Sequence, residues 1–325
     1  MKRNQLKNLL LDHMIEILLI LLVLIMTLAS PNFLTLANLL NILRNQSMKG
    51  LIAFGMTMVI IAGQIDLSVG SAVALAGVIV ARFARDLPGL TGMDAGLACA
   101  LGILVALGVA VGMGYIHASA QHKLLMPAFI VTLASLNLQY GLAGMISQGF
   151  PIANVFPKWF LWLGIGKVFG SVPVPVIILC VAFVICHWFM NYTTLGRTIY
   201  ASGGNAEAAR LSGINVFRAK VIAFAAVQVM CVIAGFIHSA QVASGSYSFG
   251  RGWEVDVISA VVIGGTSMSG GIGRAWGTMM GILFLGVLTN AMTILDIDIY
   301  TQYVIKGLIM AFAVWLSTHQ AKAKA

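Results

Sequence analysis

The sequence predicts an all-α, polytopic integral membrane protein with about 8–10 transmembrane helices, some of them short or broken. Hydrophobic residues make up 60% of the 325 residues and charged residues only 9%, far from the composition of a soluble domain. Apolar runs recur along the whole length, and Gly and Pro interrupt several of them. Residues 1–325 are therefore interpreted as a single transmembrane domain with one polar loop at about 191–218.

The first apolar run, residues 14–30, follows a basic start and ends in small residues, as a signal peptide does. It is longer than a normal signal core and contains Glu16, so we predict a retained first helix. Later runs of about 20 residues are long enough for a full crossing, whereas the shorter ones predict short or broken helices. These later runs cover 51–63, 72–84, 96–117, 127–147, 173–190, 219–240, 257–269, 275–292 and 300–317.

The distribution of Lys and Arg predicts that both termini are cytoplasmic. Basic residues are densest near 191–220 and at the two ends of the chain, where the N-terminal ones are Lys2, Arg3 and Lys7. Ten alternating spans put these segments inside, and most of the net charge of +9 is then a topology signal. Basic residues left outside or near the outer interface are Arg44, Lys49, Arg82, Arg85, Lys158, Lys167 and Arg251. No basic patch is interleaved with exposed aromatic residues, so no nucleic-acid partner is predicted.

A short, well-capped helix is predicted inside the polar loop. Asn205 is a good N-cap because its side-chain oxygen accepts from the free amides of the first turn, and Gly213 fits the left-handed position that ends a helix. Glu207 near the start and Arg210 near the end match the helix dipole. A helix this short is marginal alone in water and needs a surface to lie against.

One side of this helix carries Ala208, Leu211 and Ile214. Two interpretations are open from the residues alone. The helix is either part of an ordinary connecting loop on the membrane surface or a docking knob for a cytoplasmic partner.

Two glycine-rich segments interrupt apolar runs at matching places. "AGQIDLSVG" and "GGTSMSGG" align without gaps, which sets Gly63, Ser68 and Gly70 against Gly264, Ser269 and Gly271. This is a weak internal repeat, and such interrupted pairs often mark the midplane pathway of transporters. Under ten spans both breaks face the cytoplasmic side. Candidates for the translocation path or its gating are Asp66, Ser68, Gly70, Gly264, Gly265, Ser269 and Gly271.

Three long segments resemble the sugar-type ABC importer permeases, the family of the ribose permease. They are "LGRTIYASGGNAEAARLSGINV" (195–216), "GQIDLSVGS" (63–71) and "ISAVVIGGTSMSGGIGRAWGTMMG" (258–281), and residues 149–176 resemble the periplasmic loop of that family. The likeness covers essentially the whole chain. Gln64 departs from the pattern, since the family more often has Gly there, and this puts tight backbone packing at 63–64 in doubt.

The resemblance implies that the short helix is a coupling helix, which inserts into a cleft of a separate ATP-binding subunit. Leu211 and Ile214 would then be the anchors, with Glu207 and Arg210 at the rim. The full set of predicted docking residues is Asn205, Glu207, Ala208, Arg210, Leu211, Gly213 and Ile214. The chain has no Walker A sequence, so ATP hydrolysis is expected in the partner.

Further partners follow from the same resemblance. They are a second permease chain, identical or sister, and a periplasmic sugar-binding protein. The expected location is a bacterial inner membrane, whose lipid surrounds the chain. The segment "GWEVDVISA" resembles the sequence with which a helix begins, on the outer side, in members of that family. Candidates for contact with the binding protein are Arg251, Trp253, Glu254 and Asp256. The alternative for the two acidic residues is a salt bridge with Arg251.

Three roles are open for Asp66, because a carboxylate between apolar runs needs partners or water. The first is capping of the next helix, with Asp66 or Ser68 as the N-cap. The others are a part in gating or subunit contact, and direct binding of sugar. The glycines near 273–281 either pack helices closely or leave room for solute. Other polar groups in or beside spans, which bond helices together or line a passage, are Asn137, Gln139, Tyr140, Gln228, Gln241, Asn290 and Thr293.

The sequence is interpreted as the permease subunit of an ABC importer for a monosaccharide or a related small polar solute. No catalytic set, metal-ligand spacing or cofactor motif is found in it. The alternative is a secondary transporter driven by an ion gradient, which requires buried carboxylates, and Asp66 is the one strong candidate. Pentoses, hexoses, related furanoses and nucleoside-like ligands all remain open.

Overall fold

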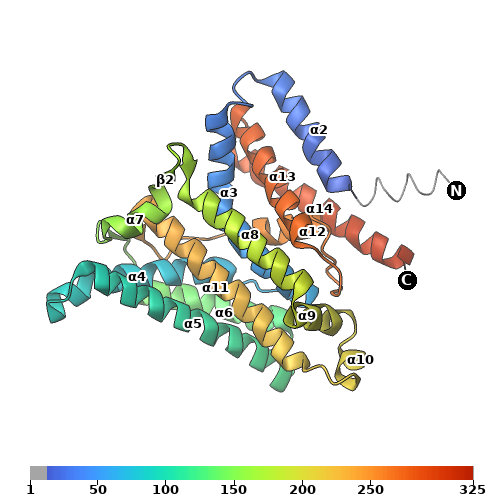
Figure 1. The fold of residues 1–325 in the computed structure, drawn as a ribbon, viewed down its shortest axis with the longest axis horizontal. Helices are drawn as coiled ribbons and strands as arrows, with labels where there is room; N and C mark the ends of the chain where they lie inside the picture. The colour runs from blue at the N-terminus through green and yellow to red at the C-terminus, as the bar shows by residue number, and fades with distance from the viewer. Residues whose placement is uncertain (1–12, 325) are drawn as a thin grey trace.

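The computed structural model describes residues 13–324, and this part of the chain is helical almost throughout (Figure 1). The basic residues Lys2, Arg3 and Lys7 lie outside the described residues. The elements are α2 (Met14–Ala29), α3 (Leu36–Ile61), α4 (Val69–Thr91), α5 (Ala95–Lys123), α6 (Ala128–Ser147), β1 (Ile152–Ala153), α7 (Lys158–Ile165), β2 (Lys167–Val168), β3 (Val172–Pro173), α8 (Val174–Tyr192), α9 (Thr194–Gly204), α10 (Ala206–Leu211), α11 (Val216–Val242), β4 (Ser244–Gly245), α12 (Trp253–Ile263), α13 (Ala275–Ile294) and α14 (Ile299–Lys324). The predicted all-α class is confirmed.

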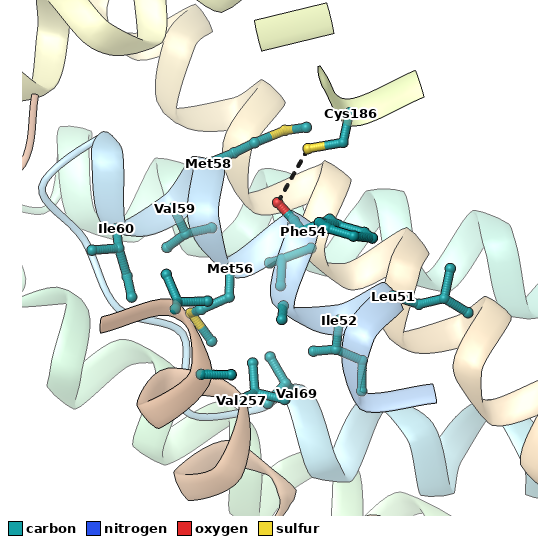
Figure 2. Packing of buried hydrophobic residues seen from close by; sticks show 14 of the residues in the cluster. Leu51, Ile52, Phe54, Met56, Met58, Val59, Ile60, Val69, Cys186 and Val257 are labelled. Carbon is teal, nitrogen blue, oxygen red and sulfur yellow. Dashed lines mark hydrogen bonds between the residues drawn. The ribbon is translucent and has the colours of Figure 1, made fainter. Parts of the chain in front are cut away.

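Helix α3 is the centre of the molecule. Every residue from Gly50 to Ile61 is buried, because this half of α3 is apolar on nearly all sides and α8, α11, α12 and α13 surround it. Figure 2 shows the packing around Phe54, whose carbonyl oxygen accepts a hydrogen bond from Cys186 Sγ of α8 at 3.8 Å. Val69 of α4 and Val257 of α12 belong to the same cluster. Four other helices therefore fix the position of α3.

A second group of buried side chains joins α4, α5, α7 and α11. Small residues let these helices approach closely: a Cβ added to Gly102 of α5 would lie only 3.0 Å from Val80 Cα of α4. A third, smaller group joins α2 to α3 and α13 through Met26, Ile42 and Val287. The strands are short, and β1 pairs with β4 while β2 and β3 form a hairpin. The molecule is thus a set of helices held together mainly by apolar contacts.

Five described helices are long and apolar enough to cross a membrane, namely α5, α6, α8, α11 and α13. α3 and α4 have 26 and 23 residues but are more polar, while α2 and α12 have 16 and 11. The short and interrupted helices were expected. The count of about 8–10 crossings stays a prediction.

Three element boundaries differ from the sequence prediction. α3 begins at Leu36 rather than near residue 51, because Thr35 caps it and Asn38 pairs its amide with Asn290 of α13 at 2.8 and 3.0 Å. The run at 257–269 is split, since α12 ends at Ile263. The polar loop contains α9 as well as the predicted helix. Residues 62–68 are called the α3–α4 break below, and residues 264–274 the α12–α13 break.

Candidate functional site

The short helix predicted after Asn205 is present as α10, and both of its predicted caps are confirmed. The Asn205 side-chain oxygen accepts a hydrogen bond from the Ala208 amide at 2.9 Å. Gly213 has a φ of +82°, in the left-handed region that favours glycine. The amide of Ile214 closes the end by donating to the Ala209 carbonyl at 3.0 Å. Local hydrogen bonds therefore define both ends of α10.

The surface of α10 is unusual because its largest apolar side chain points outward. Leu211 is 74% exposed and Ala208 is also exposed, while Ala209 is the residue buried against the body. Ile214 is half-buried, so it is less available than Leu211 as an anchor. The outer face of α10 is therefore formed chiefly by Leu211.

A side-chain ion pair spans the exposed side of α10. Arg210 donates from Nη2 to Glu207 Oε1 at 2.6 Å and from Nε to Oε2 at 3.1 Å. These hydrogen bonds hold the pKa of Glu207 below its ordinary value. Both groups are solvent-exposed, so the pair adds little to stability and leaves a charged rim beside Leu211.

The two glycine-rich breaks, which are 200 residues apart in the sequence, meet in space. The Gly271 amide of the α12–α13 break donates to the Ile61 carbonyl at the end of α3 at 2.8 Å. A Cβ added to Gly270 would lie 3.0 Å from Gly63 Cα. Gly63, Gly270 and Gly271 have φ values of +74°, +85° and +73°, which side chains disfavour. This contact therefore requires glycine at three positions.

The end of α9 packs into the same place. A Cβ added to Gly203 would lie 1.6 Å from the Ile61 carbonyl oxygen, and one on Gly271 would lie 2.7 Å from Gly204 Cα. Tyr200 of α9 donates its hydroxyl to the Gly273 carbonyl at 2.8 Å. The contact formed by Ile61, Gly63, Gly203, Gly270 and Gly271 is called the glycine junction. It joins the helix before α10 directly to the end of α3 and to the α12–α13 break, which in turn contacts the α3–α4 break at Gly63.

Asp66, in the α3–α4 break, is fully buried and surrounded by donors. Its Oδ1 accepts from the Ser68 amide at 2.8 Å and from Ser68 Oγ at 2.6 Å. Its Oδ2 accepts from Gln228 Nε2 of α11 at 2.8 Å, and His117 Nδ1 of α5 lies at 3.5 Å. Ser68 occupies the N-cap position of α4, but its own side chain makes no capping bond. Asp66 thus shapes the turn that precedes the helix.

The hydrogen bonds continue beyond Asp66. His117 Nε2 lies 2.8 Å from Ser135 Oγ of α6, which also accepts from Gln139 Nε2 at 2.9 Å. Gln139 and Gln228 border a cavity of about 10 Å³, enough for one water molecule. The order Asp66, His117, Ser135 is that of a hydrolase triad, yet all three side chains are buried and this cavity admits no substrate. The cluster therefore ties the α3–α4 break to α5, α6 and α11.

Sequence reasoning had singled out Asp66, Ser68 and Gln228 but not His117 or Ser135. His117 and Ser135 lie in different apolar helices, and nothing in the neighbouring sequence of either indicates a shared cluster.

The remaining candidates for the translocation path fall into two groups, packed and exposed. Gly70 faces the Gly250 carbonyl and Gly264 faces the Gly277 carbonyl, so both serve close packing, while Gly265 and Ser269 are exposed.

The residues predicted to contact a binding protein lie at the level of the middle of α3. Asp256 forms an ion pair with Lys49, which stands halfway along α3, and its Oδ1 lies 3.9 Å from Lys306 Nζ of α14. Arg251 makes no ion pair with any described residue and instead lies over the Tyr140 ring, 5.0 Å from its centroid. The predicted salt bridge of Arg251 with Glu254 or Asp256 is therefore wrong.

Trp253 and Glu254 are also involved in internal contacts. The Trp253 ring lies 5.2 Å from the His238 ring, and Glu254 Oε2 would be 2.9 Å from a Cβ on Gly70. Contact of Arg251, Trp253, Glu254 and Asp256 with a binding protein stays a prediction. No group of described residues has the composition of a metal site.

Comparison with known sequences places the chain among transport proteins. The profile of the family described as "Branched-chain amino acid transport system / permease component" matches residues 38–314. Ribose import permease protein RbsC of Escherichia coli (strain K12) is 39% identical over 303 residues, 92% of this chain and 91% of that protein. RbsC of Bacillus subtilis (strain 168) is 40% identical over 299 residues, 92% and 90% of the two chains.

A further relative is the L-arabinose transport system permease protein AraH of Escherichia coli (strain K12), 37% identical over 294 residues, 90% of this chain and 86% of that protein. No solved structure matches the chain. The profile covers both breaks, the glycine junction and α10. These relatives are transport permeases and not enzymes, and the apolar helices agree with several membrane crossings. The chain belongs to this family of membrane-embedded permease components of transport systems.

Proposed function

We propose that the chain is the permease subunit of an ABC importer for a monosaccharide or a related small polar solute. Relatives named for ribose and L-arabinose align over nine-tenths of the chain, which supports a sugar as the solute. The alternative of an ion-driven secondary transporter finds no support in these names. Its best candidate, Asp66, is sealed among four hydrogen-bonding or ionic contacts inside the helical body.

The coupling role of α10 rests on one observation, the exposed Leu211. An apolar side chain that is 74% exposed, on a two-turn helix capped at both ends, suits insertion into a groove of a partner protein. Charged groups of Glu207 and Arg210 would border that groove. The proposed partner is an ATP-binding-cassette subunit, which would supply the Walker A sequence that this chain lacks.

The glycine junction supports the next step. A movement of α10 reaches α9, and α9 is in backbone contact with the end of α3 through Gly203 and with the α12–α13 break through Gly203 and Gly204. The breaks end α3 and α12, so displacement of α9 changes the relative position of these two helices. ATP-driven closure of the partner would shift the population between two arrangements of the helices.

Each chain supplies one α10, so two chains, identical or sister, would engage the two halves of an ATPase dimer. With α10 on the cytoplasmic side, both termini are cytoplasmic in a bacterial inner membrane. A periplasmic sugar-binding protein would deliver the solute to the opposite face.

Substitution of Leu211 by Asp tests the coupling role. An anchor of this kind contributes about 2 kcal/mol or more, so the affinity for the ATP-binding subunit is expected to fall at least about 30-fold. The measurement is vanadate-sensitive ATPase activity that co-purifies with the chain. Leu124→Asp is the matched control, because Leu124 is 69% exposed in the turn after α5. This turn lies at the same end of the molecule as α10, since Nζ of the adjacent Lys123 is 5.3 Å from the centroid of the Phe217 ring at the start of α11.

The control is expected to keep its co-purified ATPase. Retention of coupled ATPase activity by Leu211→Asp would exclude α10 as the docking element. A chain that moves solute into vesicles without any ATP-binding partner would instead support the ion-driven alternative.

A further inference from the structure

The segment that leads into α12 lies deep within the molecule. Residues 246–252, called the α12 entry loop, are not helical. The Arg251 guanidinium lies 5.0 Å from the centroid of the Tyr140 ring, near the middle of α6. Lys49, at the middle of α3, has its Nζ 5.9 Å from the centroid of the Trp253 ring. α12 therefore begins about halfway along α3 and α6.

Part of this segment is exposed at that depth. Ser248, Arg251 and Gly252 are exposed, and Trp253 and Glu254 are half-buried. Irregular backbone in the core of a bilayer occurs only inside protein or beside a water-filled cavity, because lipid offers no partners to its amides and carbonyls. An arginine facing lipid there is costly for the same reason. This side of the molecule therefore borders water or another protein chain.

A cation and a carboxylate are held apart at this place. Arg251 forms no ion pair with a described residue, although Glu254 follows it by only three positions. Glu254 Oε2 is buried and has no hydrogen-bond partner among the described residues. The Tyr140 side chain is within electrostatic range of both charges. A buried acceptor without a donor costs free energy, so the arrangement suits a ligand that offers hydroxyl groups.

Close packing fixes these groups in position. A Cβ added to Gly70, in the first turn of α4, would lie 2.2 Å from the Gly250 carbonyl oxygen and 2.9 Å from Glu254 Oε2. Figure 2 shows Val257 of α12 beside Val69 of α4, and both belong to one apolar cluster. The beginning of α12 is thus held against the beginning of α4, which reduces the ordering that a ligand would have to impose.

We propose that Tyr140, Arg251, Trp253 and Glu254 form a sugar-contact site halfway along the solute passage. This inference rests on the proposed function, in which a monosaccharide crosses the membrane. Arg251 and Tyr140 donate to sugar hydroxyls, and Glu254 accepts from them. The half-buried Trp253 ring offers an apolar surface to the C–H face of the sugar. Helices that begin inside the membrane line the solute site of many transporters, and α12 is such a helix.

The charges favour a solute over direct contact with a second permease chain. About a twofold axis, an identical chain would bring its own Arg251 towards this one, and like charges at an interface are unfavourable. A sugar carries no charge, and each of its hydroxyls both donates and accepts. It therefore matches a site that contains one cationic donor and one anionic acceptor.

The test is the accessibility of Ser248→Cys, which places a thiol in the entry loop and leaves the four proposed residues intact. Cys180 is replaced by Ser, since it is the cysteine that the structure describes as exposed. Permease in nanodiscs with its ATP-binding subunit is treated with a charged thiol reagent that does not enter lipid. Val184→Cys is the matched control, because Val184 is 62% exposed in the middle of the apolar helix α8. Ser248→Cys is expected to react at least about tenfold faster, because the thiolate forms and meets the reagent only beside water.

Sugar is expected to protect this thiol. D-ribose, L-arabinose and D-glucose are added in turn, and betaine at the same concentration serves as the control for a solute that is not a sugar. At least one sugar is expected to slow the labelling about threefold, the factor reached at about twice its dissociation constant. Betaine is expected to leave the rate unchanged.

Two further variants connect the protection to the proposed side chains. Arg251→Gln and Tyr140→Phe, each combined with Ser248→Cys, are expected to raise the sugar concentration needed for protection at least about fivefold. Arg82→Gln is their control, because Arg82 pairs with Asp86 on α4 and lies outside the site. It is expected to leave the protection unchanged.

Several results would overturn the proposal. They are labelling of Ser248→Cys as slow as that of Val184→Cys, labelling that no sugar slows, and protection that persists unchanged in both Arg251→Gln and Tyr140→Phe. Slow labelling together with a disulfide between two copies of Ser248→Cys would assign this face to contact between permease chains instead.

Transport by the wild type separates this inference from the proposed function. The wild-type chain is reconstituted in proteoliposomes with its ATP-binding subunit and the solute-binding protein encoded with it. Failure to move any of the three sugars would contradict the proposed solute and, with it, the sugar-contact site. Transport of a sugar that does not protect Ser248→Cys would contradict the sugar-contact site alone.

Discussion

Asp66 shows how a single carboxylate is kept inside an apolar molecule. Its two oxygen atoms accept hydrogen bonds from Ser68, two residues further on, and from Gln228 of α11. One of them also lies close to the His117 ring of α5. Gln228 Nε2 also bonds Ser68 Oγ at 2.9 Å, so one amide group serves both members of the turn. Removal of that amide therefore affects the whole turn that begins α4.

Gln228→Leu is expected to destabilise the protein, because a buried carboxylate then loses a donor at a cost of about 1–3 kcal/mol. The measurement is the thermal unfolding temperature in detergent. Gln241→Leu, on the same helix, is the control, since Gln241 Oε1 is buried without a hydrogen-bond partner among the described residues and its loss leaves no acceptor unsatisfied. An equal decrease in the two variants would contradict a special contribution of the hydrogen bond to Asp66.

At the scale of elements, the glycine junction matters because backbone touches backbone. α9, the end of α3 and the α12–α13 break approach so closely that Gly203 has no room for a Cβ, while the Cβ of an alanine at Gly204 would have its nearest neighbour at 4.0 Å. Two adjacent glycines of one helix thus differ in what they permit. This difference allows the transmitting contact to be changed without altering α10.

Gly203→Ala is expected to push α9 away from Ile61 and to lower the amount of solute moved per ATP hydrolysed. Transport into proteoliposomes and ATP hydrolysis are measured on the same sample. Gly204→Ala should keep the coupling ratio, and its helix gains up to about 1 kcal/mol from the better helix former. A normal coupling ratio in a folded Gly203→Ala variant would show that the junction does not transmit the movement.

At the scale of the whole molecule, charge is sorted by depth. Along α3, Arg44 lies in the N-terminal third without an ion pair to any described residue, and Lys49 at the middle is paired with Asp256. Lys306 of α14 lies on the other side of the same carboxylate at 3.9 Å. One acidic residue thereby holds two cations and three helices together inside the membrane body.

Asp256→Asn is expected to lower the free energy of unfolding by on the order of 3 kcal/mol, because Lys49 and Lys306 then face each other without compensation. Asp86→Asn is the control, since Asp86 pairs with Arg82 and Arg85, whose side chains are 36% and 41% exposed against 24% for Lys49 and 17% for Lys306. Pairs nearer to solvent contribute about 0–1 kcal/mol. Thermal unfolding in detergent compares the two. Similar losses would indicate that the central ion pair is as weak as a surface pair.

Local signals in the sequence were sufficient for helices and caps. Apolar runs predicted the helical class, and the residue types at Asn205 and Gly213 predicted both ends of α10, because capping depends on a few neighbouring atoms. α9 was not predicted, and the N-terminal half of α3 was missed because its Asn38 and Lys49 have their partners on α13 and α12. Those partners lie more than 200 residues away.

Contacts between distant segments were the part that sequence reasoning did not reach. The weak repeat marked the two breaks, yet nothing local indicates that Gly203 fits between Ile61 and Gly271. His117 was missed for the same reason, since a histidine in an apolar helix has no neighbour in sequence that reveals Asp66. Such pairings are decided by tertiary packing, which overrides local preference.

The central position of α3 has a consequence for how the protein is made. α3 is surrounded by other helices, yet it is not among the five described helices that are apolar enough to span a bilayer alone. During synthesis it emerges long before α11 and α13. Its polar groups and its apolar half both need contacts with these later helices. We expect nascent α3 to stay at the insertion machinery or the membrane surface until those later helices arrive, so that assembly of the core follows the translation of the C-terminal half.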